Sequence, residues 1–112
     1  MPYYDVDGRE ITEDEWKRLS DDRVYLRVGA TELRSDGPPQ TVIRVSTVWT
    51  GVDTGGWEIF ESLVDKDGRK AMVVKYHTRD AAKEGHNALV GKFMSELPPG
   101  AREAREIPAE ET

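Results

Sequence analysis

The chain has 112 residues, of which 37% are hydrophobic and 34% are charged, and it contains no cysteine. This length predicts one small domain, and a chain without thiols forms no disulfide, no thiolate metal site and no cysteine nucleophile. No apolar run reaches the roughly 20 residues that a membrane span requires. Residues 1–20 also lack the apolar core of a signal peptide, so we expect no secretory signal there.

The net charge of −6 is concentrated at the two ends of the chain. Residues 1–22 hold eight acids and three bases, residues 98–112 hold four acids and two bases, and residues 23–97 hold ten acids and eleven bases. Nucleic-acid binding usually shows as a basic stripe, so this distribution disfavours nucleic acid as a partner. Two interpretations of the strand arginines stay open, a cluster across neighbouring strands or a solvated sheet face. These arginines are Arg23, Arg27, Arg34 and Arg44.

The first 20 residues predict a small hairpin followed by a short helix. Asp7 and Gly8 suit the positive φ angles of a tight hairpin turn. Thr12 and Glu15 have the spacing of a capping box, in which each side chain bonds to the backbone N–H of the other residue. The N-terminus is therefore expected to be a structured part of the domain.

Four strands are predicted next, at residues 22–34, 41–50, 57–64 and 70–77, because apolar and polar residues alternate through them. Turn-forming residues separate these strands and favour short antiparallel connections. The residues expected to share one face of the second strand are Ile43, Val45, Thr47 and Trp49. Those expected to share one face of the third strand are Trp57, Ile59, Glu61 and Leu63.

A long amphipathic helix is predicted from the N-cap Thr78 to about Leu97, where two prolines and a glycine follow. Its apolar stripe comprises Ala82, His86, Leu89, Val90, Phe93 and Leu97. The sheet is the only surface large enough to receive that stripe. We therefore predict an α+β fold over residues 1–97, an antiparallel sheet of about four strands with this helix across one face. Residues 98–112 are expected to form a flexible acidic tail.

The sequence carries VSTVWTGVD at residues 45–53, IFESLV at residues 59–64, YHT at residues 76–78, and the Gly85-His86 pair in the last predicted helix. Together these motifs resemble a family of small uncharacterised proteins of actinobacteria and their phages. The chain departs from the family pattern at Ser62 and Leu63, where threonine and methionine are common, and in the loop after Asp53. The resemblance implies a phage or prophage protein that acts in a bacterial cytoplasm, and it implies no activity.

A candidate site follows from polar residues on apolar faces. Thr47, Glu61 and His86 are each predicted to face the core, and a buried carboxylate is costly unless it is paired. Three interpretations stay open: a hydrogen-bonded cluster that fixes the helix register, a binding pocket with Trp49 and Asp53 at its rim, and a His–Glu acid/base pair.

The aromatic side chains of Trp49 and Trp57 flank the glycine-rich loop, and they are either core residues or a platform for a planar ligand. The candidate binding residues are Thr47, Trp49, Asp53, Trp57, Glu61 and His86. The only histidines are His77 and His86, and no motif for a metal or a cofactor is present, so we expect no metal, no cofactor and no catalytic group.

Three functions are therefore considered. The first is a small non-enzymatic interaction protein that binds a host protein or forms a homo-oligomer. The second is a module that sequesters a nucleotide-like small molecule. The third is a hydrolase that uses His86 and Glu61.

Overall fold

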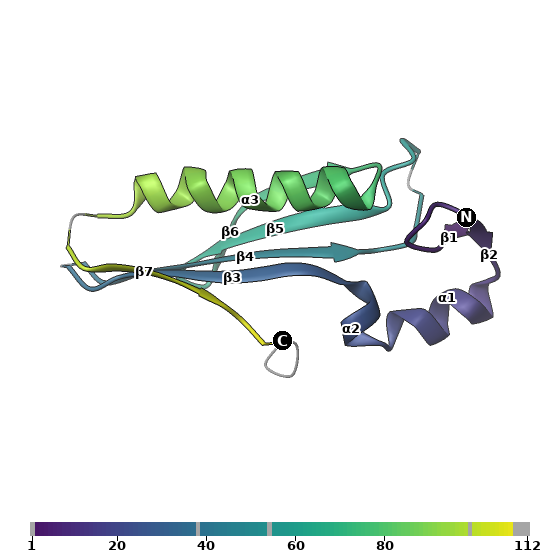
Figure 1. Ribbon diagram of the computed structural model, residues 1–112, viewed down its shortest axis with the longest axis horizontal. Coiled ribbons are helices and arrows are strands. Elements are labelled where there is room, and N and C mark those ends of the chain that lie inside the picture. The colour runs from purple at the N-terminus through teal and green to yellow at the C-terminus, as the bar shows by residue number, and fades with distance from the viewer. Residues whose placement is uncertain (1, 38, 54, 99, 109–112) are drawn as a thin grey trace.

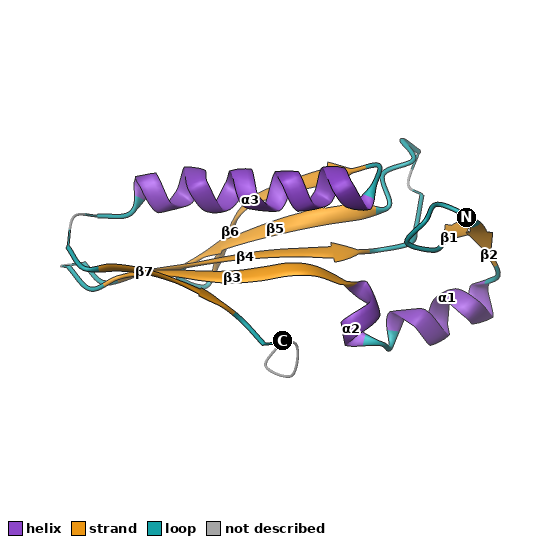
Figure 2. Ribbon diagram, in the orientation of Figure 1, coloured by secondary structure: helices purple, strands orange, loops and turns teal. Residues whose placement is uncertain are grey.

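A computed structural model describes residues 2–37, 39–53, 55–98 and 100–108. Figures 1 and 2 show a long helix laid along a twisted sheet, with a small hairpin and two short helices at one end. The elements in chain order are β1 (Tyr3–Tyr4), β2 (Glu10–Ile11), α1 (Glu13–Ser20), α2 (Arg23–Leu26), β3 (Arg27–Ser35), β4 (Thr41–Trp49), β5 (Phe60–Lys66), β6 (Arg69–Tyr76), α3 (Arg79–Glu96) and β7 (Arg102–Glu106).

The main sheet has five strands in the order β6-β5-β4-β3-β7, and every pair is antiparallel. Helix α3 crosses one face of this sheet and contacts β3, β4, β5 and β6. The predicted α+β class and the predicted place of the long helix are confirmed. We call the sheet face opposite α3 the open face, because no described helix crosses its centre.

Alternation along β4 separates the two faces as the sequence predicts. Ile43, Val45 and Thr47 are almost fully buried beneath α3, whereas Val42, Arg44, Ser46 and Val48 lie on the open face. The core beneath α3 comprises Leu33, Ile43, Val45, Val64, Leu89, Phe93 and Leu97. A second core, built around Tyr4, Trp49, Ile59, Phe60 and Ala82, joins the sheet to the N-terminal elements.

The ends of α3 follow from local chemistry. The Thr78 side chain accepts a hydrogen bond from the Ala81 N–H at 3.1 Å, as an N-cap does. In the middle of the helix Gly85 lies against the Tyr76 ring, and a Cβ added there would approach the ring to 2.1 Å. Only glycine therefore permits this close contact between α3 and β6.

The N-terminal hairpin and cap form largely as predicted. Gly8 has φ +83° in the turn between β1 and β2, and Asp5 accepts the backbone N–H groups of Asp7 and Arg9. Thr12 caps α1 by accepting the Glu15 N–H at 3.2 Å. The Glu15 carboxylate forms an ion pair with Arg18, so only this half of the predicted capping box is seen.

The predicted strand at residues 22–34 is wrong at its start. Asp22 accepts the N–H groups of Val24 and Tyr25, which begins the short helix α2 before β3 starts at Arg27. Val24 consequently lies outside the sheet with 75% of its surface exposed. A local cap has prevailed over the alternating pattern in this segment.

The flexible tail predicted from residue 98 onwards is also wrong for the residues that the structure describes. Arg102–Glu106 form β7, which pairs with β3 from Thr31↔Glu106 to Ser35↔Arg102. The Ile107 N–H then donates to the Ala30 carbonyl, and the Ile107 side chain is buried, with 7% relative exposure. The last four residues, 109–112, lie outside the described part of the chain.

Among the described residues, no helix combines the length and the apolar character needed to cross a membrane.

Candidate functional site

A chain of buried polar side chains lies between the sheet and α3. His86 Nδ1 lies 2.7 Å from Thr47 Oγ1, and His86 Nε2 lies 3.0 Å from Thr31 Oγ1. Thr47 Oγ1 also lies 2.5 Å from Ser62 Oγ on the neighbouring strand. Both nitrogens of the imidazole are thus engaged by hydroxyl groups, as a buried histidine requires.

Backbone geometry makes room for the His86 ring. The ring lies over Gly29, where an added Cβ would approach Nε2 to 3.0 Å. The β3–β4 pairing shifts register between Arg27 and Gly29, so a bulge occurs directly beneath the ring. A larger residue at position 29 would displace the imidazole from its two threonine partners.

Burial holds the pKa of His86 below its ordinary value. The Glu106 carboxylate opposes this shift, and the Arg27 guanidinium adds to it. The neutral imidazole donates one hydrogen bond and accepts the other. Such a group fixes the position of α3 on the sheet, and it would have to give up a threonine bond before it could accept a proton from a substrate.

Glu61 is not part of the hydrogen-bonded cluster of His86, Thr47, Thr31 and Ser62, which corrects the prediction. The buried residues of β5 are Phe60, Ser62 and Val64, so Glu61 lies on the open face. Ser62 takes the predicted place of Glu61 opposite Thr47. The His86–Glu61 pair therefore does not form.

Trp49 is a core residue rather than part of a ligand platform. It is 2% exposed, donates its indole N–H to the Tyr4 carbonyl at 2.9 Å, and packs edge-on against Tyr25. Trp57 precedes β5, has φ +60°, and is 65% exposed with its ring centroid 5.4 Å from that of Tyr4. The two tryptophans thus occupy different environments.

Asp53 organises the loop before β5. Its Oδ1 accepts the N–H groups of Gly55 at 2.8 Å and Trp57 at 2.9 Å. These backbone hydrogen bonds lower the pKa of the carboxyl below its ordinary value. The Asp53 carboxylate is therefore committed to the conformation of its own loop.

A different arrangement, which the sequence did not predict, occupies the open face. The register aligns Val73, Leu63, Ser46 and Ala30 in one row across β6, β5, β4 and β3. Leu63 is 37% exposed and Val73 is 40% exposed, so two large apolar side chains adjoin each other in solvent. The open face therefore carries an exposed apolar pair, Leu63 and Val73, that no described helix covers.

A row of alternating charge borders this apolar pair. Asp65, Arg44, Glu32 and Arg105 are successive register partners across β5, β4, β3 and β7. Glu32 is only 5% exposed and forms ion pairs with Arg34 at 3.1 Å, Arg44 at 3.2 Å and Arg105 at 3.8 Å. Of the two interpretations of the strand arginines, a cluster across strands therefore holds for Arg34 and Arg44.

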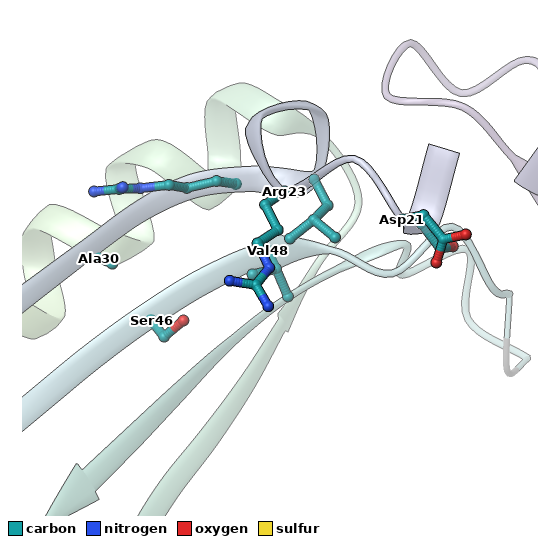
Figure 3. A pocket seen from close by; sticks show the side chains of 8 residues that line it. Asp21, Arg23, Ala30, Ser46 and Val48 are labelled. Atoms are coloured by element: carbon teal, nitrogen blue, oxygen red, sulfur yellow. The ribbon is translucent and has the colours of Figure 1, made fainter. Parts of the chain in front are cut away.

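Two hollows lie on the open face and meet at Ser46. One has a volume of about 520 Å³ and is lined by residues of the α1–α2 connection, α2, β3 and β4, including Arg23, Ala30 and Val48 (Figure 3). The other has a volume of about 620 Å³ and extends over Leu63 to the β5–β6 turn. Figure 3 shows the Arg23 side chain directed across the sheet beside Val48.

The predicted binding residues thus fall into separate places: Thr47 and His86 beneath α3, Glu61 on the open face, and Trp49, Asp53 and Trp57 towards the N-terminal hairpin. Among the described side chains, no three of His, Asp and Glu gather as a metal site. Comparison with family models, curated proteins and solved structures finds no match to this chain.

Proposed function

We propose that this chain is a small non-enzymatic interaction domain that binds another protein through its open face. The observation that carries the proposal is the adjacent exposure of Leu63 and Val73 on a sheet face that no helix of the described residues covers. Water contact with such a pair is unfavourable, and a partner that covers both side chains recovers hydrophobic free energy.

The surroundings of this pair have the anatomy of a protein interface. An apolar centre lies within a charged rim, which includes Glu61 and Lys75 on one side and Asp65 and Arg44 on the other. Acids and bases alternate around the centre, so the rim matches a partner surface that also carries both signs of charge. Uniformly charged surfaces, such as a nucleic-acid backbone or an anionic membrane, fit this pattern poorly.

The partner's setting is part of the same proposal. The resemblance to small proteins of actinobacteria and their phages favours a phage or prophage product that acts on a host protein in the bacterial cytoplasm. The neutral, doubly hydrogen-bonded His86 supports a role without catalysis, because neither ring nitrogen is left to act on a substrate.

Photo-crosslinking tests which face meets the partner. A crosslinking side chain at Ser46, between the two hollows, is expected to capture a host protein in cells. The same side chain at Lys83, exposed on α3, is expected to capture little. Equal capture from both positions, or capture from Lys83 alone, would contradict the proposed face.

Substitution then tests the apolar pair. Leu63→Gln combined with Val73→Gln is expected to abolish the Ser46 crosslink without a change in net charge. Val24→Gln is the matched control, since it removes an apolar side chain that is 75% exposed in α2 and outside the sheet. If the double variant retains the crosslink at full strength, the open face is not the binding surface.

A ligand-binding function is the second candidate, and the hollow beside α2 favours it. Its volume of about 520 Å³ lies within the range of small-molecule sites, and Arg23 and Arg27 both line it. A nucleotide-like ligand at 100 times its Kd would stabilise the fold by about 2.7 kcal/mol. A thermal-shift screen against nucleotides, with Arg27→Gln as the control, tests this candidate. If no nucleotide raises the thermal midpoint of the wild-type chain, the candidate is rejected.

A further inference from the structure

The outer edge of β7 differs from the other free edge of the main sheet. Among the described strands, β7 pairs only with β3 and ends the strand order, and β6 ends it on the opposite side. All five residues of β7 are exposed. A strand edge with unpaired backbone groups is a template for another strand.

The hydrogen-bond pattern identifies the backbone groups that point outwards. Asp36 donates to the Ala101 carbonyl, and Ile107 donates to the Ala30 carbonyl. In an antiparallel ladder, hydrogen-bonded pairs recur at every second residue, so residues 103 and 105 also direct their backbone groups towards β3. Arg102, Ala104 and Glu106 consequently present their N–H and C=O groups to the outside.

The sequence of β7, REARE, is complementary in charge to itself when read in the opposite direction. If a twofold axis passes at Ala104, Arg102 lies opposite Glu106 of a second copy, and Glu103 lies opposite its Arg105. Every charged residue of the strand then meets an opposite charge, and two small alanines meet at the centre. Opposite charges placed across an antiparallel pair stabilise it, and like charges destabilise it.

The same register also satisfies the outward backbone groups. It pairs Ala104 with its own copy and Arg102 with Glu106 of the second copy, and each such pair exchanges two backbone hydrogen bonds. A shift by two residues in either direction would place Glu103 against Glu103 or Arg105 against Arg105. Charge and backbone geometry therefore select one register.

The β6 edge has no comparable arrangement. Its charged residues are Arg69, Lys70 and Lys75, all of them basic. Antiparallel pairing of β6 with its own copy therefore brings no opposite charges together, and basic residues on an edge strand oppose such pairing. Self-association along the sheet edges is thus favoured at β7 alone.

From these observations we infer that two copies of this chain pair through β7, about a twofold axis at Ala104, into one continuous antiparallel sheet. The axis runs perpendicular to the sheet, so both copies of α3 lie on one side and both open faces lie on the other. The inference is independent of the proposed partner, but it would double the open face that the proposed function uses.

A five-residue strand pair makes a small contact, which predicts a dimer that dissociates on dilution. Sedimentation equilibrium from about 5 μM to about 500 μM covers a Kd on either side of about 50 μM. The wild-type chain is expected to shift from monomer to dimer across this range. A monomer at every concentration would overturn the inference.

Ala104→Pro tests the edge directly. Proline removes an N–H that points outwards and leaves the β3–β7 hydrogen bonds intact. This variant is expected to remain monomeric, whereas the Ala104→Ser control is expected to dimerise. An unchanged thermal midpoint would show that Ala104→Pro still folds, and dimerisation of this variant would place the contact elsewhere.

A charge swap tests the register. Glu106→Arg places arginine opposite Arg102 of the second copy and is expected to weaken the dimer at least tenfold. Combining it with Arg102→Glu restores opposite charges and is expected to restore dimerisation. Because Arg102 also bonds to the Leu97 and Pro98 carbonyls, the thermal midpoint of the swap is measured beside it. Failure of a swap with the wild-type midpoint to rescue the dimer would overturn the twofold register.

The Leu63→Gln, Val73→Gln double variant separates this inference from the proposed function. It is expected to lose the host-protein crosslink and to keep the β7 dimer, while Ala104→Pro loses the dimer. A dimer that the open-face variant abolishes would assign self-association to the open face and contradict pairing through β7.

Discussion

At the scale of single residues, polar side chains at His86 and Glu32 are buried for structural reasons. His86 is bonded by two threonine hydroxyls beneath α3, and Glu32 is surrounded by arginines on the open face. Each group loses contact with water and gains hydrogen bonds or opposite charges in return. Removing either side chain is expected to destabilise the fold, because its partners are left without a hydrogen bond or with unbalanced charge.

His86→Ala is expected to lower the free energy of unfolding by about 3 kcal/mol, from two lost hydrogen bonds and a cavity beneath α3. Asn87→Ala, one residue further along α3 and exposed, is the matched control and is expected to change little. Urea denaturation measures both variants. A His86→Ala protein as stable as the control would show that the hydrogen bonds of His86 do not hold α3 on the sheet.

The lowered pKa of His86 predicts a pH dependence of stability. As the pH falls below about 6.5, the unfolded chain takes up a proton on this histidine before the folded chain does. The contribution of His86 to stability is therefore complete above that pH and declines below it. The slope between pH 7 and pH 5 is expected to be shallower in His86→Gln and unchanged in Asn87→Gln. Parallel profiles for His86→Gln and the wild type would contradict the assignment.

Tyr76→Phe is expected to leave stability unchanged or to raise it by up to about 1 kcal/mol. The Tyr76 hydroxyl is buried without a hydrogen-bond partner among the described residues, so its removal abolishes a desolvation cost. Thermal unfolding is the measurement, with Tyr25→Phe as the contrasting variant. The Tyr25 hydroxyl accepts the Val6 N–H at 3.0 Å, so its loss is expected to destabilise the protein.

At the scale of elements, β7 contributes more to the fold than its charged sequence, REARE, suggests. Its side chains are all exposed, yet Arg102 donates to the Leu97 and Pro98 carbonyls at the end of α3, and Arg105 forms an ion pair with Glu32. The strand therefore connects the end of the helix to the edge of the sheet.

Truncation after residue 101 is expected to lower the free energy of unfolding by about 2–3 kcal/mol, the scale of one buried isoleucine. The truncated chain loses Ile107, which is 7% exposed, and the contacts of β7 with β3. Ile107→Ala in the full chain separates the apolar part of this effect. A truncated chain as stable as the full one would restore the expectation of a tail without structure.

Element boundaries were predictable where local signals agree with one another. The cap at Thr78, the stripe from Ala82 to Leu97 and the turn at Asp67 and Gly68, both with positive φ, all follow from spacing and residue type. The prediction of strand at residues 22–26 was wrong because Asp22 caps a helix there, and this helix signal is about as strong as the alternating strand pattern. Strand β7 was missed because edge pairing with β3 requires no apolar alternation.

At the scale of the whole molecule, the N-terminal elements lie at one end of the long axis (Figure 1). The longest extent of the molecule is 49 Å. Hydrogen bonds from two tryptophan indole N–H groups connect these elements to the end of the sheet. Trp16 donates to the Thr50 carbonyl at 2.8 Å, and Trp49 donates to the Tyr4 carbonyl at 2.9 Å. The hairpin and α1 thus share the second core with the sheet.

Trp16→Phe is expected to remove one of these bonds at a cost of about 1 kcal/mol and to loosen the N-terminal elements locally. Amide hydrogen exchange is expected to accelerate in residues 3–11 and to stay unchanged in α3. Trp57→Phe, at a mostly exposed ring, is the control. Uniform acceleration across the chain would show that the N-terminal elements unfold only together with the sheet.

By itself, the sequence determined the α+β class, the capped helices α1 and α3, the tight turns and the faces of β4, because these depend on residues a few positions apart. It also brought Thr47 and His86 together, since both lie on stripes that must face each other. Tertiary structure decided which face of β5 is buried, because Ile59 and Leu63 on one side balance Phe60 and Val64 on the other. It likewise decided that Ser62 takes the place of Glu61 and that arginines from three strands share Glu32. These outcomes depend on strand order and register, which bring together residues far apart in the chain and leave no local signal in any one of them.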